Sequence, residues 1–468
     1  MSEPAGGPLE LAREVLGGER CWIVGGAVRD ELRGAPPSAD LDLVTGADVG
    51  RAARALARAA RGAAFPLSDE FGAWRVVGRE HRWQVDLGPL RGDSIEADLA
   101  LRDFTVNAMA RPLRGGGLID PLGGAADLAA GRLRLAGPQA IAADPLRALR
   151  LVRLACELGL RPDEAARAAA RGGARGLEHV AGERVYLELR RVLASECPAD
   201  GMRLALELGA AAAVLPELAA LRGVSQSRYH HLDVLDHTLE VLECMARIEA
   251  DPAAAFGAEH APAVAALLAT PLADEMTHGL ALRFAALLHD IAKPQTRAVW
   301  EDGRVGFPGH DLAGGEVART VLTRLHAAER MRAFVEALTR THLRLGFLVR
   351  EAPLAGEVLY DYLDACDRVA ADVTVLSVAD RLATRGEGQE RSIERHLALA
   401  QAVIDDALRW QLGGRPPALV DGRRLIDALG LEPGPLVGEL LAAIEREAFA
   451  GRLHTPQDAL AFAARRIA

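Results

Sequence analysis

Two short segments near the start of the chain carry residues suited to handling a phosphate-bearing ligand. An apolar run at residues 21–24 leads into the glycine pair Gly25 and Gly26. Glycines leave backbone N–H groups accessible to phosphate oxygens, and a helix that begins after them points its positive end at the same anion. A glycine pair alone is most often a tight turn, so any chemistry here needs a second group of residues nearby.

The second segment contains a pair of carboxylates, Asp40 and Asp42, in an apolar stretch. Side chains two residues apart on a strand share a face and lie about 6–7 Å apart, so both carboxylates can bind the same Mg²⁺ ions. Such ions hold the attacking and leaving oxygens of a phosphoryl displacement. The combination of a glycine pair and a carboxylate pair predicts a nucleotidyl-transfer site with Asp40 and Asp42 as catalytic residues.

The order of these motifs resembles the DNA polymerase beta superfamily and, more narrowly, the bacterial class II tRNA nucleotidyltransferase and poly(A) polymerase family. Residues 25–30 are similar to that family's G-G-x-V-R-D motif, and residues 102–108 to the end of its R-R-D-F-T-x-N-A motif. Residues 120–124 and 144–153 match its next two motifs. The superfamily pattern also contains a later lone carboxylate, which implies Asp86, in another apolar segment, as a third catalytic residue. The resemblance covers nearly the whole chain. It implies addition of CCA to the tRNA 3′ end from CTP and ATP, without a nucleic acid template and with Mg²⁺.

The same resemblance implies a set of nucleotide-binding residues. They are Gly25, Gly26, Arg29, Arg102, Asp103, Asn107, Asp144, Arg147, Arg150 and Arg153. Asp144 and Arg147 are three residues apart, which on a helix places them on one face. A carboxylate acceptor and a guanidinium donor can together read the edge of a base, so this pair is expected to select CTP and ATP. An isolated pair with this spacing is more often a surface salt bridge.

The chain departs from the family pattern at three places. Leu101 replaces the first Arg of R-R-D-F-T, and Ala143 replaces the Glu of E-D-x-x-R. The stretch between Asp86 and Arg102 is also short, whereas CCA-adding members usually carry a longer flexible loop there. Such shortening is a feature of relatives that add only the two cytidines, so addition of CC alone remains an alternative.

A second set of residues resembles the H…HD…D order of the HD phosphohydrolase superfamily. Imidazole and carboxylate groups suit a divalent transition metal or Mg²⁺, whose open positions would bind water and phosphate. The resemblance implies four metal ligands and two possible additional ones, although a single histidine is more often a core or surface residue. The four are His237, His289, Asp290 and Asp380, and the additional two are His310 and His342. Lys293, the only lysine in the chain, is predicted to support this site by contacting a phosphate or orienting Asp290.

The apolar periodicity predicts the elements that position these residues. Helices are expected at 9–16, 27–33 and 48–61, strands at 21–25 and 40–45, and a hairpin at 73–78 and 82–88, giving a small mixed sheet with helices on one face. From about residue 141 the pattern is helical, apart from an Ala/Pro-rich interval at 251–278 that predicts an irregular insertion. The fold class is therefore α+β: a polymerase-beta-like head with a small mixed sheet, then an all-α neck, body and HD domain.

These patterns, together with the family resemblance, imply four domains. They are a nucleotidyltransferase head (1–140), a helical neck and body for base selection and RNA binding (141–225), an HD domain (226–385) and a helical C-terminal segment in contact with tRNA (386–468).

Composition limits the setting. The chain has no apolar run near the roughly 18 residues of a spanning helix, no secretory signal and no C-x-x-C pair among its five cysteines, which together predict a cytoplasmic protein without a membrane partner. The net charge of −10 is unusual for an RNA-binding protein, but arginines are dense between residues 132 and 153.

Besides CC addition, two alternatives for the function remain: a poly(A) polymerase, or an HD phosphohydrolase whose N-terminal half only binds RNA.

Overall fold

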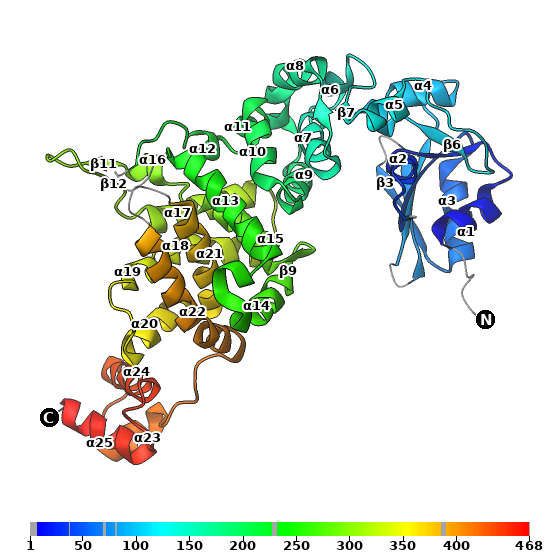
Figure 1. The fold of residues 1–468 in the computed structure, drawn as a ribbon. Coiled ribbons are helices and arrows are strands. Elements are labelled where there is room, and N and C mark those ends of the chain that lie inside the picture. Colours follow the sequence, from blue (N-terminus) through cyan, green and yellow to red (C-terminus); the bar gives the residue numbers. More distant parts are fainter. Residues whose placement is uncertain are drawn as a thin grey trace. The chain divides into compact units, whose positions relative to one another are not determined.

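A computed structural model describes residues 7–36, 38–68, 72–79, 82–226, 232–384 and 390–467. The chain divides into two compact units (Figure 1). The first comprises Met1–Val180 and Glu207–Ala213, and the second comprises Ala181–Leu206 and Val214–Ala468. The predicted domain limits at residues 140, 225 and 385 remain predictions.

The first unit contains a six-stranded mixed sheet in the order β3-β4-β5-β2-β1-β6. Its strands are β1 (Cys21–Val24), β2 (Asp40–Thr45), β3 (Ala63–Ser68), β4 (Ala73–Val77), β5 (Gln84–Pro89) and β6 (Ala110–Pro112). Strands β2 and β5 pair in parallel, with Asp42 opposite Asp86, while the other neighbours are antiparallel. The α+β class and the mixed sheet are confirmed, and β3 and β6 are additions to the predicted strands.

Helices pack on both faces of this sheet, so the expectation of a single covered face is wrong. Helices α1 (Pro8–Leu16), α2 (Gly26–Leu32) and α3 (Val49–Ala60) share a core with Leu41 and Leu43 of β2. On the other face, Val44 packs with α4 (Ile95–Ala100). The cause is that apolar residues occupy both sets of alternating positions in the central strands.

The rest of the chain is mainly helical, as predicted, but it also contains short two-stranded sheets, among them β7 (Arg132–Leu133) with β8 (Arg161–Pro162) and β11 (Ala298–Val299) with β12 (Val305–Gly306). The first unit continues with α5 (Gly124–Ala129), α6 (Ala140–Ala143), α7 (Arg147–Leu158) and α8 (Glu164–Gly173). Helices α9 (Gly182–Ala194), α10 (Pro198–Glu207), α11 (Ala210–Val214) and α12 (Pro216–Ala219) follow. The body of the second unit contains α13 (Val234–Ala250), α15 (His278–Leu288), α16 (Lys293–Thr296), α17 (His310–Arg324), α18 (Glu329–Thr341), α19 (Arg344–Leu348), α20 (Gly356–Cys366), α21 (Ala370–Ala383) and α22 (Glu390–Gly413).

The last helices, α23 (Gly422–Leu429), α24 (Pro435–Phe449) and α25 (Pro456–Ile467), form a small core of their own. They also join the body through side chains of α20. The Tyr360 hydroxyl donates to Glu445 of α24 at 3.1 Å, and Arg446 pairs with Asp361 at 2.5 Å.

The interval 251–278 is not an irregular insertion, contrary to the prediction. It forms α14 (Ala253–Ala269), with a kink where Gly257 leaves helical geometry, and then a hairpin of β9 (Pro271–Ala273) and β10 (Met276–Thr277). Alanine is the strongest helix former, and burial of Phe256, Val264 and Leu267 stabilises the helix despite its glycine and proline.

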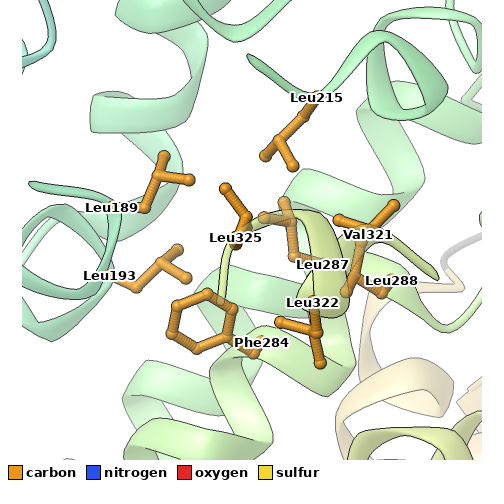
Figure 2. A pocket seen from close by; sticks show the side chains of 9 residues that line it. All are labelled: Leu189, Leu193, Leu215, Phe284, Leu287, Leu288, Val321, Leu322 and Leu325. Atoms are coloured by element: carbon orange, nitrogen blue, oxygen red, sulfur yellow. The ribbon is translucent and has the colours of Figure 1, made fainter. Parts of the chain in front are cut away.

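A small cavity of about 10 Å³ lies in the core of the second unit, between α9, α15 and α17. Figure 2 shows nine side chains around it, all aliphatic or aromatic, from residues including Leu189, Phe284 and Leu322. A space of this size and lining is a packing defect rather than a ligand site. Across the described residues, no helix is both long and apolar enough to cross a membrane.

Candidate active sites

Strand alternation places the predicted catalytic carboxylates on one face of the head sheet. Leu41 and Leu43 point into the core beneath α1 and α3, so Asp40 and Asp42 point to the opposite face. Asp42 and Asp86 line a cleft of about 330 Å³ on that face. The structure therefore brings Asp42 and Asp86 together, with Asp40 two residues before Asp42 on the same strand.

Gly25 approaches these carboxylates closely. Its φ is +70°, and a Cβ at this position would lie 3.3 Å from Oδ2 of Asp42 and 3.5 Å from a guanidinium nitrogen of Arg102. Both the left-handed backbone and the crowding favour glycine here. Helix α2 begins at the next residue, Gly26, in agreement with the predicted turn.

Opposite charges partly balance the carboxylates. Arg75 on β4 donates two hydrogen bonds to Asp86, Nε to Oδ1 and a terminal nitrogen to Oδ2, both 2.8 Å long. Loss of solvation in the cleft, followed by repulsion from Asp86, raises the pKa of Asp42 to about 6. Such a site attracts cations, and carboxylate oxygens are the ligands that Mg²⁺ prefers.

Sequence reasoning missed Asp98 on α4, which organises the rim of the same cleft. Asp98 is completely buried. Its Oδ1 accepts hydrogen bonds from the backbone N–H and the side chain of Arg91, at 3.2 and 3.1 Å. Its Oδ2 accepts two hydrogen bonds from the Arg102 guanidinium, both at 3.1 Å. All three residues line the cleft. The signal available in the sequence was the four-residue spacing between Asp98 and Arg102, which places them on one side of a helical turn.

Several predicted nucleotide-binding residues form one hydrogen-bonded network. Arg29 donates to Oδ1 of Asn107 at 2.6 Å, and Nδ2 of Asn107 donates to Oδ1 of Asp103 at 3.2 Å. Arg150 of α7 donates to Oδ2 of Asp103 at 3.1 Å. Burial would raise the pKa of Asp103, but the Arg150 guanidinium and the backbone N–H of Phe104 outweigh it and lower that pKa. Asp103 therefore stays ionised and links α7 to the glycine-pair helix α2.

The structure corrects the local geometry of Asp144 and Arg147. Asp144 lies between α6 and α7 with extended backbone, so the two residues do not share a helix. The reason is Pro145, because a residue that precedes proline avoids the helical region. Arg147 begins α7 and donates to the backbone carbonyls of Leu101 and Arg102, at 3.2 Å each.

Arg153, another predicted nucleotide-binding residue, is buried within α7. It donates to Glu157 of the same helix at 2.9 Å. Its role in nucleotide binding stays a prediction.

The second candidate site contains six side chains, which come from within or directly beside five helices. They form two groups of three ligand atoms, each within 4.8 Å: His237, His289 and Asp380, and Asp290, His310 and His342. His237 comes from α13, His310 from the start of α17 and Asp380 from α21, while His289 and His342 directly follow the ends of α15 and α18. The structure brings all four predicted ligands and both additional histidines together.

The hydrogen bonds of three histidines fit metal binding. Nδ1 of each pairs with the backbone carbonyl three residues earlier: His289 with Ala286 at 2.8 Å, His310 with Phe307 at 2.7 Å, and His342 with Thr339 at 2.7 Å. Because a carbonyl only accepts, Nδ1 carries a proton in each ring, and Nε2 is the atom that faces the cluster. The three Nε2 atoms are buried, and those of His289 and His310 lie 3.1 and 3.3 Å from carboxylate oxygens of Asp290, so the ligand atoms point toward one another as expected around a metal.

Lys293 lies against this cluster. Its Nζ is 2.6 Å from Oδ2 of Asp290, donates to Gln226 at 2.7 Å and lies 5.2 Å from the centre of the Phe307 ring. Burial would raise the pKa of Asp290, but His289 and Lys293 together hold it well below the usual range. Asp290 is therefore an anion that can bind a cation, and Lys293 fixes its position.

Comparison with known proteins agrees with this arrangement. Three family models match the chain: "Poly A polymerase head domain" at residues 21–134, "Probable RNA and SrmB- binding site of polymerase A" at 159–221, and "HD domain" at 234–385. The complex structure of a CCA-adding enzyme with ATP matches with a TM-score of 0.65 and 19% identity, covering 98% of this chain and 95% of the other. At that identity the likeness concerns the fold.

Curated relatives are similar over most of their length. The A-adding tRNA nucleotidyltransferase of Deinococcus radiodurans is 38% identical over 95% of this chain and 94% of its own length. The CC-adding tRNA nucleotidyltransferase of Thermus thermophilus is 35% identical over 94% and 92%, and the Multifunctional CCA protein of Azoarcus sp. is 32% identical over 90% and 99%. With these similarities and the head and HD folds described above, the chain belongs to the tRNA nucleotidyltransferase family.

Proposed function

We propose that this enzyme extends the 3′ end of tRNA with C, C and A, taken from CTP and ATP, without a nucleic acid template. The observation that carries the proposal is the alignment of Asp40 and Asp42 on one strand face, with Asp86 opposite and Gly25 beside them. Carboxylates at this spacing beside a glycine turn suit the binding of a metal-bound triphosphate.

Each residue has a role in this mechanism. Asp40 and Asp42 would hold Mg²⁺, which lowers the cost of deprotonating the attacking hydroxyl and neutralises the leaving pyrophosphate. Arg102 binds the triphosphate from the cleft rim, and Arg29, Asp103 and Asn107 orient the ribose. The tRNA 3′ oxygen bonds to the α-phosphorus of the nucleotide, and the bond to the bridging oxygen breaks.

The catalytic assignment is tested by Asp40→Ala. This change removes one carboxylate at an exposed strand position, so the protein should fold normally and lose nucleotide incorporation. Circular dichroism checks the fold and radiolabelled CTP incorporation checks activity. Incorporation at the wild-type rate would contradict the assignment.

Base selection is assigned to Asp144 and Arg147. Arg147 is held by backbone carbonyls near Arg102, and Asp144 lies three residues before it. Asp144→Ala and Arg147→Ala should each reduce the preference for CTP over UTP in competition assays. An unchanged preference in both variants would exclude them as base readers.

Addition of CC alone is a second candidate, favoured by the structure of the short connection. β5 ends at Pro89 and α4 begins at Ile95, with Asp98 tying this segment to Arg102. The discriminating assay offers CTP and ATP, separately and together, to a tRNA that ends at its discriminator base and to one that ends in CC. CCA addition requires both C incorporation on the first and A incorporation on the second.

The same assay covers the other outcomes. Incorporation of A on the CC-ended tRNA alone would match the name of the Deinococcus relative. Long tails made with ATP alone would indicate a poly(A) polymerase. No incorporation on either tRNA would indicate that the N-terminal half only binds RNA.

We further propose that the HD site is a metal-dependent phosphohydrolase. His237, His289 and Asp380, with Asp290, His310 and His342, would hold divalent ions, which activate water and polarise a phosphate. Lys293 positions Asp290. Hydrolysis of phosphate esters that is lost in His289→Ala would support this activity, and hydrolysis that persists in that variant would exclude this site.

Two further proposals concern the parts of the chain that bind tRNA and the compartment in which the enzyme acts. We propose that residues 141–225 and 386–468 contribute to tRNA binding, and that the enzyme acts in the cytoplasm, where tRNA is its substrate.

A further inference from the structure

The face of the head sheet that carries the catalytic carboxylates continues to the outermost strand, β3. The pairing register leads from Asp42 on β2 to Asp86 on β5, Arg75 on β4 and Phe65 on β3. Residues paired directly across neighbouring strands lie on the same face of a sheet. Phe65 therefore lies on the face of the two carboxylates, at the strand that ends the sheet order.

This outer part of the face is apolar and exposed. Phe65 and Leu67 of β3 are each 43% exposed. Leu67 lines the cleft of the carboxylates, and so do the small residues Ala73 and Gly88. A Cβ at Gly88 would meet no other atom of the described residues within 4 Å, so there is room above the sheet here. The cleft thus has a charged part at β2 and an apolar part towards β3.

The geometry of nucleotidyl transfer indicates which ligand reaches the apolar part. Gly25 and helix α2, which suit the triphosphate, follow β1, and β1 adjoins β2 on one side. Strands β5, β4 and β3 lie on the other side of β2. In an in-line displacement the attacking and leaving oxygens are on opposite sides of the phosphorus. The pyrophosphate leaves on the side of β1, so the attacking hydroxyl comes from the side of β3.

The apolar part suits the terminal base of the RNA that carries this hydroxyl. Three strand spacings separate β2 from β3, roughly 14 Å in all, which accommodates one nucleoside. Every base has a flat face that can pack on an aromatic side chain without hydrogen bonds that read its identity. Such a contact suits an acceptor whose terminal base changes after each addition.

We propose that Phe65 and Leu67 bind the terminal base of the acceptor RNA and so hold its 3′ hydroxyl in place for attack. The base packs against these two side chains, the ribose lies over Ala73 and Gly88, and the hydroxyl reaches the carboxylates of β2. This inference rests on the proposed nucleotidyl transfer to the tRNA 3′ end and assigns the residues that receive that end.

Substitutions at Phe65 should affect the acceptor and not the incoming nucleotide. With the tRNA that the wild type extends best, Phe65→Ala should lower kcat/KM for tRNA roughly tenfold, as expected for loss of a stacked ring, and leave the KM for the nucleotide unchanged. Phe65→Tyr keeps the ring and should retain the wild-type value. Phe65→Val keeps a residue that favours strands but has no ring, so it should match Phe65→Ala. A wild-type value for Phe65→Val would indicate a role in strand stability and overturn the inference.

Leu67 has a matched control in the same unit. Leu67→Ala should lower kcat/KM for tRNA severalfold, by less than Phe65→Ala, because a leucine covers less of a base than an aromatic ring does. Leu32→Ala changes a leucine on α2 that is 38% exposed and outside the cleft lining, and it should retain the wild-type value. Equal losses in these two variants would show that the effect of Leu67→Ala is not specific to the cleft.

A second experiment tests contact with the base directly. The same tRNA is prepared with an abasic ribose at its 3′ terminal position, and both tRNAs are offered to the wild type and to Phe65→Ala. Removal of the base should lower kcat/KM roughly tenfold in the wild type and have little further effect in Phe65→Ala, because each change removes the same contact.

The outcomes separate this inference from the function on which it rests. Base removal that costs the wild type and Phe65→Ala equally, or costs the wild type nothing, would overturn the inference and leave the transfer function intact. No incorporation by the wild type on any tRNA would overturn both.

Discussion

Asp98 shows how a single buried carboxylate can hold two arginines that line a cleft. It accepts hydrogen bonds from Arg91 and Arg102, and both arginines line the cleft that contains Asp42 and Asp86. Removing it would leave two guanidinium groups without their shared partner, so their positions would become variable.

We expect Asp98→Ala to reduce nucleotide incorporation roughly tenfold or more, since a positioned charge-assisted contact contributes about that much. Asp98→Asn keeps one acceptor oxygen and should recover part of the rate. Steady-state kinetics with CTP measures this, together with thermal unfolding to separate positioning from loss of fold. A role in fold stability alone would change the melting temperature and leave kcat and KM of the folded fraction unchanged.

The ionised Asp42 carboxylate destabilises the folded protein, and its proposed role in metal binding would explain why the residue is an aspartate. Its pKa is raised from 3.8 to about 6, so the ionised carboxylate is less favourable in the folded protein than in the unfolded chain. The stability contributed by this group is therefore fully present below pH 3.8 and is lost as the pH rises through about 6.

We therefore expect Asp42→Asn to raise the melting temperature of the metal-free protein at pH 7. Because solvent reaches the carboxylate, the gain should not exceed about 1 kcal/mol. The difference should shrink as the pH is lowered towards 4, and added Mg²⁺ should stabilise the wild type only. Thermal unfolding in EDTA at several pH values measures this, and a variant less stable than the wild type at pH 7 would contradict the assigned pKa.

At the scale of elements, a buried polar contact joins three helices of the second unit. Nδ1 of His278, the first residue of α15, lies 3.0 Å from Oδ1 of Asp372 on α21. Gln411 on α22 donates to Oδ2 of Asp372 at 2.6 Å and accepts from the backbone N–H of Ala371 at 2.9 Å. Asp372 is completely buried, so these hydrogen bonds offset its loss of solvation.

We expect Asp372→Ala to lower the free energy of unfolding by about 3–5 kcal/mol, because it leaves a buried imidazole and amide without their acceptor. A double variant, Asp372→Leu with His278→Phe, should cost less than the single change because it removes both polar groups. Chemical denaturation measures both. A double variant less stable than the single one would show that packing, rather than polar pairing, controls this contact.

For the whole molecule, the two candidate sites belong to different compact units. The residues around Asp42 lie in the first unit, and the six HD ligands lie in the second. Each site has its own supporting core, so damage to one should not disturb the other.

We expect Asp40→Ala to retain the phosphohydrolase activity of the wild type, and His289→Ala to retain nucleotide incorporation. Metal analysis should find fewer bound transition metal ions in His289→Ala than in the wild type, because one ligand group loses a member. Loss of both activities in either variant would show that the sites are coupled.

Local patterns in the sequence were sufficient to predict much of this protein. Alternation in residues 40–45 predicted a strand with both aspartates on one face, and the glycine pair predicted the turn, because these depend on backbone periodicity and φ alone. The mixed sheet and the helical body were predicted from the change of apolar period. The same local reasoning failed where context decided: Pro145 breaks the expected helix at Asp144, and packing makes α14 a helix.

Only the tertiary structure decided which distant residues meet. Residues from five helices converge to form two ligand groups, Asp98 joins Arg91 and Arg102, and Arg75 pairs with Asp86 across two strands. The cavity beside the HD ligands likewise arises from segments that are separated along the chain. Sequence spacing specifies the face on which a side chain lies, but contacts between separate elements depend on how those elements pack, which no local pattern contains.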